Sequence, residues 1–209
     1  MRISLSRIHF PVTALGPGKR IGIWFQGCSL RCKGCLSPDT WEVKQNSILV
    51  DDLITQIRPW FDYADGITIS GGEPFEQPEA LHALLIGLRQ QFIGDIFIYS
   101  GYQWNEIKPQ VDMMSGLIDA LMSEPYQIDV PQTQVLRGSD NQQLHCLTPM
   151  GKARFNTFNR ALTEHDKILD LTMDEEGRLY LTGIPKQGDM ARLRELLAQQ
   201  NTQLKQIKR

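Results

Sequence analysis

Residues 21–35 read IGIWFQGCSLRCKGC, and the interpretation of the whole chain starts from this stretch. Three cysteines, Cys28, Cys32 and Cys35, are separated by three and then by two residues, and they directly follow a run of large and β-branched apolar residues. Such a run predicts a buried strand, because branched and aromatic side chains pack well on a pleated surface. Three cysteines on one short loop after that strand indicate a metal site.

The number of available ligands decides which metal site is predicted. A structural zinc site is normally closed by four ligands, usually as two separated pairs. This chain has no second pair: Cys146 stands alone, where it is most simply a small buried hydrophobe, and the four histidines are scattered. Three cysteines instead suit a four-iron cluster held at three corners, which leaves one iron free to bind a small molecule.

A second motif follows the hydrophobic run at residues 66–69, where residues 70–74 read SGGEP. Glycines adopt backbone angles that are closed to other residues and let a ligand lie against the main chain. Glu73 comes just past the predicted strand end, where ligands of parallel sheets collect. A lone exposed Glu is usually a solvated charge, but the flanking Gly-Gly and Pro favour a functional role for Glu73.

The cysteine spacing and the GGEP stretch, in this order, resemble the radical S-adenosylmethionine (radical SAM) superfamily. Further strings resemble the anaerobic ribonucleoside-triphosphate reductase activating proteins, which are glycyl-radical activases. The resemblance covers about the first seven-tenths of the chain. Ser123 and Glu124 depart from it, since the family carries Asp-Gly there. The matching residues are Gly16, Gly18 and Arg20, Gln26 and Gly27, Pro38, Thr40 and Trp41, residues 99–102, Asp119, Leu121, Pro125 and Tyr126, and residues 137–142 except Asp140.

The resemblance implies two cofactors, a [4Fe-4S] cluster and S-adenosyl-L-methionine (SAM). Cys28, Cys32 and Cys35 would hold the cluster, and no residue is predicted as a general acid or base. A flavodoxin or ferredoxin would supply the electron that cleaves SAM to a 5′-deoxyadenosyl radical, and the radical would install a glycyl radical on a protein partner. The implied cofactor-binding residues are Gly34, Ser70, Gly71, Gly72, Glu73, Pro74, Ser100, Gly101, Arg137, Ser139 and Asn141.

Other functions stay open at this point. A radical SAM enzyme acting on a small molecule, similar to the 7-carboxy-7-deazaguanine synthases, also has a short chain and GGEP. A diverged activase with another partner would explain the departures at Ser123 and Glu124. An iron–sulfur electron carrier or a zinc-stabilised binding module would not be an enzyme at all, and GGEP would then have no purpose.

The order of the predicted elements indicates an α/β fold. Strands at residues 67–70, 95–99 and 116–122 alternate with helices at 50–61, 78–92 and 103–114. An Asp at 51 or 52 is available to cap the first helix, and Pro59 and Pro109 are expected to disturb the helices that contain them. Such alternation is typical of a parallel sheet. By analogy with the superfamily, the sheet is expected to form a partial β/α barrel with the cluster at the carboxyl ends of its strands.

Residues 1–149 are predicted to form the radical SAM core, and residues 150–209 a C-terminal extension packed on the same domain. The extension is expected to contain a hairpin over 167–173 and 178–182 and a helix over 187–203, with Leu193, Leu196 and Leu197 facing a core. Residues 205–209 are predicted to be frayed. The extension carries no chemical motif and is expected to shape substrate access.

Composition sets the remaining limits. A chain of 209 residues fits one domain, and a formal charge of −2 provides no basic footprint for nucleic acid. The first 20 residues interrupt their apolar pieces with Arg2, Arg7, His9 and Pro11, so they are predicted to be neither a signal peptide nor a membrane span, but a lead-in that ends in a flexible turn. We therefore expect a cytoplasmic protein without a membrane partner, in which cysteines serve metal chemistry rather than disulfides.

Overall fold

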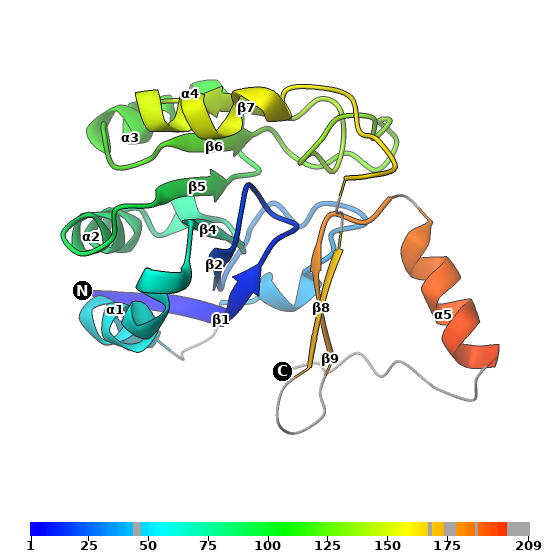
Figure 1. Cartoon of the computed structure of the whole chain (residues 1–209), viewed down its shortest axis with the longest axis horizontal. Helices are drawn as coiled ribbons and strands as arrows, with labels where there is room; N and C mark the ends of the chain where they lie inside the picture. The colour runs from blue at the N-terminus through cyan, green and yellow to red at the C-terminus, as the bar shows by residue number, and fades with distance from the viewer. Residues whose placement is uncertain (44–46, 167–168, 174–178, 187, 200–209) are drawn as a thin grey trace.

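The apolar runs predicted as strands form the middle of one mixed sheet in the computed structural model (Figure 1). The structure describes residues 1–209 except 44–46, 167–168, 174–178, 187 and 200–209. Seven strands lie in the order β3-β1-β2-β4-β5-β6-β7. Their bounds are Arg2–Val12 for β1, Arg20–Phe25 for β2, Ser47–Leu49 for β3, Gly66–Gly71 for β4, Asp95–Tyr99 for β5, Ala120–Ser123 for β6 and Gln143–Cys146 for β7.

The four central strands β2, β4, β5 and β6 are parallel, which confirms the α/β class. Ile21 pairs with Ile67, and Ile67 with Ile96, so the carboxyl ends of these strands meet at one edge. Strands β1, β3 and β7 are antiparallel additions at the two sides of the sheet. The strand order leaves β3 and β7 as edges, and curvature into a partial barrel stays a prediction.

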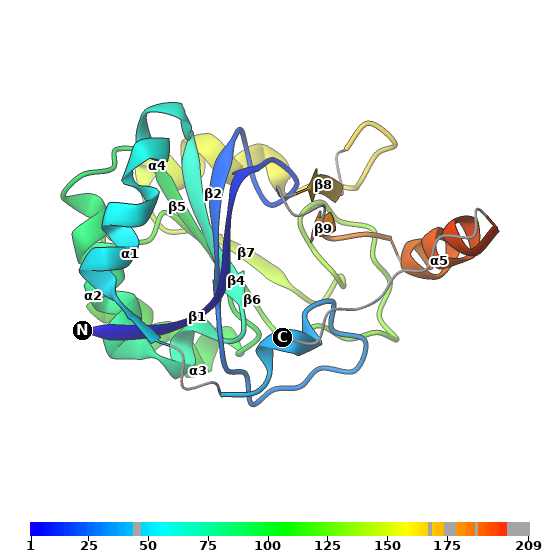
Figure 2. The same cartoon turned by 90° about the horizontal axis from the view of Figure 1, so that it is seen from below.

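Helices cover both faces of the sheet because successive strand residues point to opposite sides. Helices α1 (Val50–Ile57), α2 (Pro78–Arg89) and α3 (Trp104–Met113) pack on the face that carries Ile96 and Ile98. Helix α4 (Pro149–Phe155) covers the other face, where Phe155 packs against Phe97 and Met122. Figure 2 shows α1 and α2 on one side of the sheet and the C-terminal segment on the other.

Several boundaries differ from the sequence-based expectation. Strand β1 was not predicted, because its charged residues and Pro11 interrupt the apolar pattern; its residues Ile3 and Val12 are nonetheless buried, in two different apolar clusters. Leu49, not an Asp, occupies the N-cap of α1, and both Asp residues lie in its first turn. Helix α3 continues through Pro109, where buried contacts of Ile107 and Val111 on the core outweigh the lost hydrogen bond.

Three further elements are shorter than predicted. Helix α2 ends at Arg89 rather than at residue 92, because the following residues turn and place Phe92 back on the core. Strand β6 begins at Ala120 rather than at residue 116, because Gly116 has a φ of 80° that does not fit a strand. Helix α1 ends at Ile57 and gives way to a 3₁₀ turn over Arg58–Tyr63, which contains the predicted disturbance at Pro59.

The predicted C-terminal hairpin and helix are both present, as β8 (Leu169–Met173) paired with β9 (Leu179–Gly183) and as α5 (Asp189–Gln199). Helix α4 crosses the expected boundary at 149/150, and the division into core and extension stays a prediction. The expectation that Leu196 faces a core is wrong, because its exposed fraction is 50%. The side chain of Leu197, the predicted helix end at 200–203 and the predicted frayed tail at 205–209 lie outside the described residues.

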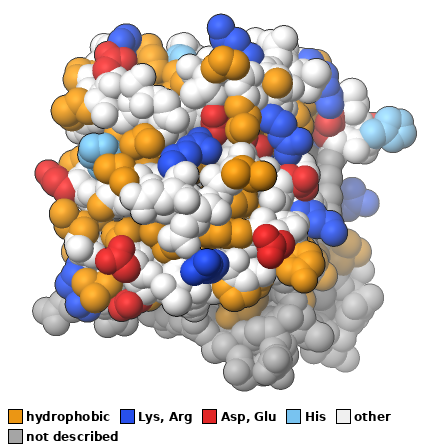
Figure 3. Space-filling view, turned by 60° about the vertical axis from the view of Figure 1, so that its left-hand side comes forward, with side chains coloured by type: hydrophobic (Ala, Val, Ile, Leu, Met, Phe, Trp, Pro, Cys, Tyr) orange, Lys and Arg blue, Asp and Glu red, His pale blue; other side chains and the backbone are white. Residues whose placement is uncertain are grey.

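The surface seen in Figure 3 carries both charge signs, interspersed with scattered apolar side chains. This mixture agrees with the small net charge of −2. In the part of the chain that the structure describes, no helix combines the length and the apolar character needed to cross a bilayer.

Candidate functional site

The three cysteines lie on a loop that leaves the carboxyl end of β2 and closes on itself. The main-chain N–H of Gly27 donates to the carbonyl of Thr40 at 2.7 Å, and that of Cys28 donates to the carbonyl of Trp41 at 3.0 Å. Between these closures Arg31 and Gly34 have φ values of 45° and 81°, in the left-handed region that lets a short chain turn tightly. We call residues 26–41 the cluster loop.

All three predicted ligands are free, half-buried thiols. Burial raises the pKa of Cys28, although main-chain N–H groups of Leu30 and Arg31 act in the opposite direction. Burial is also the largest cause that raises the pKa of Cys32. Such thiols become thiolates when a positive metal centre compensates for the lost hydration, so the donor set fits an iron–sulfur cluster.

Three free thiols on one loop are compatible with a cubane cluster. Among the described residues, no group of three His, Cys, Asp or Glu converges on one possible ion position. A cubane cluster does not require such convergence, because its cysteines bind different iron atoms at separate corners.

The Gly-Gly pair after β4 is packed against the cluster loop. Gly71 has a φ of 102°, and a Cβ at Gly72 would lie 2.1 Å from the carbonyl oxygen of Gly27. The main-chain N–H of Gly72 donates to the carbonyl oxygen of Phe25, and that of Glu73 donates to the carbonyl oxygen of Gly27, both at 2.8 Å. The cluster loop therefore leaves no space for a Cβ at position 72. Its packing alone requires glycine there, independently of any bound ligand.

The side chain of Glu73 is buried, with an exposed fraction of 1%. Its carboxylate accepts hydrogen bonds from Ser100 Oγ at 2.9 Å, Gly101 N at 2.7 Å and Phe75 N at 3.0 Å. Burial raises the pKa of Glu73 to about 7, because the three donors only partly replace the lost water. Glu73 thus connects the ends of β4 and β5, and its contact with the SAM amino group stays a prediction.

A cavity of about 520 Å³ adjoins the cluster loop. Its size falls in the usual range of small-molecule sites. Four of the predicted site residues line it: Gly34 and Cys35 from the cluster loop, and Ser70 and Gly71 from the end of β4. The other predicted residues at the ends of β4 and β5 do not line the cavity, and they support these strand ends instead. They are Gly72, Glu73, Pro74, Ser100 and Gly101.

The opposite walls of this cavity include residues that the sequence analysis did not assign to a site. Tyr99 and Tyr126 belong to matching strings and could have been included on that signal. The C-terminal segment offered no such signal. Its contributions are Leu169, Leu181, Thr182, Gly183, Ile184, Pro185, Lys186, Gly188 and Met190.

The predicted contacts Arg137, Ser139 and Asn141 hold the loop after β6 in shape. Arg137 is buried and donates to Gln142 O and Asn159 Oδ1, both at 2.7 Å. Ser139 Oγ accepts from Gln127 N at 3.0 Å, and Asn141 Nδ2 donates to Pro125 O at 2.8 Å. The contact of these three residues with SAM therefore stays a prediction, while their role in ordering the loop is seen directly.

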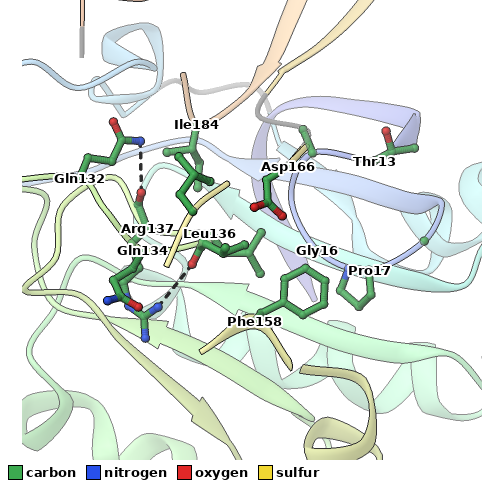
Figure 4. A pocket seen from close by; sticks show the side chains of 14 residues that line it. Thr13, Gly16, Pro17, Gln132, Gln134, Leu136, Arg137, Phe158, Asp166 and Ile184 are labelled. Atoms are coloured by element: carbon green, nitrogen blue, oxygen red, sulfur yellow. Dashed lines mark hydrogen bonds between the residues drawn. The ribbon is translucent and has the colours of Figure 1, made fainter. Parts of the chain in front are cut away.

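A second, smaller cavity of about 220 Å³ lies beside the same loop (Figure 4). Gln132 donates to the carbonyl of Arg137 at 3.3 Å, and this contact is drawn in the figure. Phe158, Leu136 and Ile184 form apolar walls. This second cavity contains none of the cysteines and none of the GGEP residues.

Glu124, which departs from the matching string together with Ser123, adopts a backbone conformation that is usual for glycine. Glu124 has a φ of 81°, a conformation that favours the glycine of the matching string. Its carboxylate accepts from the first N–H of α3, on Trp104, at 3.0 Å. Ser123 Oγ lies 2.9 Å from Nε2 of His145, which stacks on Trp104.

Comparisons with known proteins agree with this site. Residues 14–145 match the family described as 4Fe-4S single cluster domain. The chain is 28% identical over 134 residues to the anaerobic ribonucleoside-triphosphate reductase-activating protein of Enterobacteria phage T4, which covers 62% of this chain and 85% of that protein. It is 32% identical over 155 residues to the pyruvate formate-lyase-activating enzyme of Clostridium pasteurianum, covering 70% of this chain but 58% of that enzyme.

QueE from Escherichia coli aligns with 48% of this chain and 52% of its own, at 22% sequence identity and a TM-score of 0.39.

Proposed function

Since the chain belongs to the family of 4Fe-4S single cluster domains, we propose that it installs a glycyl radical on a protein partner. Together with its similarity to activating proteins, this family makes it a radical SAM enzyme with a [4Fe-4S] cluster and SAM as cofactors. The observation that carries the proposal is the position of the cluster loop. Cys35 and Gly34 border the 520 Å³ cavity together with Ser70 and Gly71 at the end of β4. A molecule in this cavity lies beside the predicted cluster.

The chain's own residues would divide the work as follows. Cys28, Cys32 and Cys35 hold three irons as thiolates. Ser70 and Gly71 line the cavity and are available to orient SAM. Trp24 and Leu36 provide apolar lining of the cavity beside the cluster loop. A [4Fe-4S] cluster held there would supply the one-electron reduction that cleaves the carbon–sulfur bond of SAM to methionine and a 5′-deoxyadenosyl radical.

The protein partner is the finer part of the proposal. The similar proteins are named as activating proteins of a ribonucleoside-triphosphate reductase and of pyruvate formate-lyase. These names support a glycyl-radical protein as the hydrogen donor, with a flavodoxin or ferredoxin as electron donor. Residues from the C-terminal segment line the cavity opposite the cluster loop, which supports a role for this segment in substrate access.

Reconstitution of the full chain without oxygen tests the cofactor part. Addition of iron and sulfide should load a cluster on the wild-type protein, and SAM with dithionite should then yield 5′-deoxyadenosine. Cys32→Ala should lose both the bound iron and the product, because one corner of the cluster loses its ligand. Cys146→Ala is the matched control and should retain both, since Cys146 lies on β7 rather than on the cluster loop. Full activity of Cys32→Ala would refute the assignment.

The partner is tested separately by electron paramagnetic resonance (EPR). The loaded protein is mixed with SAM, reductant and a glycyl-radical protein, either the large anaerobic ribonucleotide reductase subunit or pyruvate formate-lyase. A doublet from a glycyl radical supports the activase function. Formation of 5′-deoxyadenosine without a radical on either protein would favour a small-molecule substrate or another partner, and absence of 5′-deoxyadenosine would favour a non-catalytic cluster protein.

A further inference from the structure

Glu76 contacts the cluster loop although it lines neither cavity. It ends the 3₁₀ turn Pro74–Glu76 that follows the Gly-Gly pair. Its Oε1 accepts hydrogen bonds from Ser29 N at 2.8 Å and from Ser29 Oγ at 2.6 Å. The hydroxyl of Tyr102 donates to the same oxygen at 3.3 Å. One carboxylate thus holds the residue that directly follows Cys28.

The charge of Glu76 is not compensated by a cation in the described part of the chain. Two other carboxylates of this region form ion pairs, Asp39 with Arg7 and Glu42 with Arg31. The partners of Glu76 are neutral donors. Because Ser29 directly follows Cys28, the Glu76 carboxylate lies next to a predicted cluster ligand. The field of this carboxylate therefore reaches the predicted cluster without being cancelled locally.

We propose that Glu76 is a positioning residue that fixes Ser29 beside Cys28 and keeps the reduction potential of the bound cluster low. The inference rests on the proposed function, because it requires the cluster. Reduction adds one electron, taken from the flavodoxin or ferredoxin, to a centre that already faces a fixed negative charge. That charge disfavours the reduced form, and a more strongly reducing cluster results.

The experiment measures the potential of the cluster, not the activity. Wild-type and Glu76→Gln proteins are reconstituted without oxygen and titrated with dithionite and redox mediators, and the reduced cluster is followed by EPR. Gln keeps the oxygen that accepts from Ser29 but removes the charge. We expect the ratio of reduced to oxidised cluster at a fixed solution potential to rise about tenfold, which equals about 59 mV for one electron.

Glu79→Gln is the matched control. It removes the same charge three residues further on, from an exposed position in the first turn of α2. Its potential should equal that of the wild type. Glu76→Asp keeps the charge on a shorter side chain, and its potential should stay low as well.

The outcomes separate this inference from the proposed function. Equal potentials in the wild-type and Glu76→Gln proteins would overturn the role of Glu76 while the cluster itself stands. If Glu76→Gln loads less cluster, the titration still decides, because it reports only on loaded protein. A wild-type protein that binds no cluster would instead refute the proposed function.

Discussion

At the scale of single residues, the acidic side chains near the cluster loop differ in what holds them. Asp39 and Glu42 face arginines, whereas Glu73 and Glu76 accept hydrogen bonds from N–H and O–H donors. Glu73 is buried and Glu76 is half-buried. Burial therefore raises the pKa of Glu73 in the folded chain. Because the unfolded chain lacks this shift, the free energy of unfolding depends on the protonation of Glu73.

The first residue-scale prediction concerns the pH dependence of stability. The pKa of Glu73 rises from 4.5 to about 7 on folding, so between these pH values the folded chain binds more protons than the unfolded chain. Stability should fall as pH rises through this window, by about 3 kcal/mol if one pKa unit is worth about 1.4 kcal/mol. Glu73→Gln should remove this component.

Urea unfolding of the metal-free protein at pH 5 and pH 8 checks this expectation. Between pH 5 and pH 8 the wild type should lose more unfolding free energy than Glu73→Gln, so the variant should be relatively more stable at pH 8. Other titrating groups are common to both proteins and cancel in the difference. A difference that is the same at both pH values would contradict the linkage.

At the scale of elements, Asp170 attaches the β8–β9 hairpin to the residues that directly follow β1. This side chain is 7% exposed and accepts hydrogen bonds from Thr13 N at 2.6 Å, Ala14 N at 2.7 Å and Thr13 Oγ1 at 2.7 Å. The attachment places Leu169 and Leu181 at the wall of the larger cavity. Hydrogen bonds to a charged group are worth about 1.5–3 kcal/mol each, so the contact is strong for so small an element.

Asp170→Asn should loosen the hairpin without unfolding the core. The amide oxygen can still accept from Thr13 N and Ala14 N, and the amide nitrogen can donate to Thr13 Oγ1, but these hydrogen bonds are weaker because the charge of the carboxylate is gone. We expect faster hydrogen exchange at β9 and little change in β4. Asp112→Asn on α3 is the control, because its side chain is exposed and forms an i,i+4 pair with Lys108. Unchanged exchange at β9 would show that other contacts hold the hairpin.

At the scale of the whole molecule, burial is concentrated in the parallel strands. Ile21, Ile23, Ile67, Ile69 and Ile98 are fully buried. A buried ion pair between Arg20 and Asp95 joins β2 to β5 near their amino ends. Helix α5 differs, since none of its side chains that the structure describes is fully buried. Stability is therefore expected to vary strongly along the chain.

Native-state hydrogen exchange followed by mass spectrometry should reveal this gradient. Amides of β2, β4 and β5 should exchange only through global unfolding, and their exchange should accelerate with urea like the global transition. Amides of α5 should exchange far earlier and with little dependence on urea, because their opening exposes little surface. Equal protection of α5 and β4 would contradict the gradient.

Much of this organisation could be predicted from sequence. The parallel strands carry continuous apolar runs, and each is followed by its motif, so the loop after β2 and the SGGEP stretch after β4 were both expected at one edge. Strand β1 was missed, because its core contact alternates with charged and half-exposed positions. The contact of Glu76 with Ser29 was also missed, since it joins side chains 47 residues apart.

Sequence alone determined the chemistry of this protein: three thiols on one loop and a Gly-Gly-Glu-Pro stretch after a strand are local patterns, and their residue types and spacing are visible without coordinates. Only the tertiary structure decided how these groups are used. It placed the Glu73 carboxylate on Ser100 and Gly101, Glu76 on Ser29, and the C-terminal hairpin across the cavity. The physical reason is that burial and hydrogen-bond partners arise from segments distant in sequence, which no local pattern encodes.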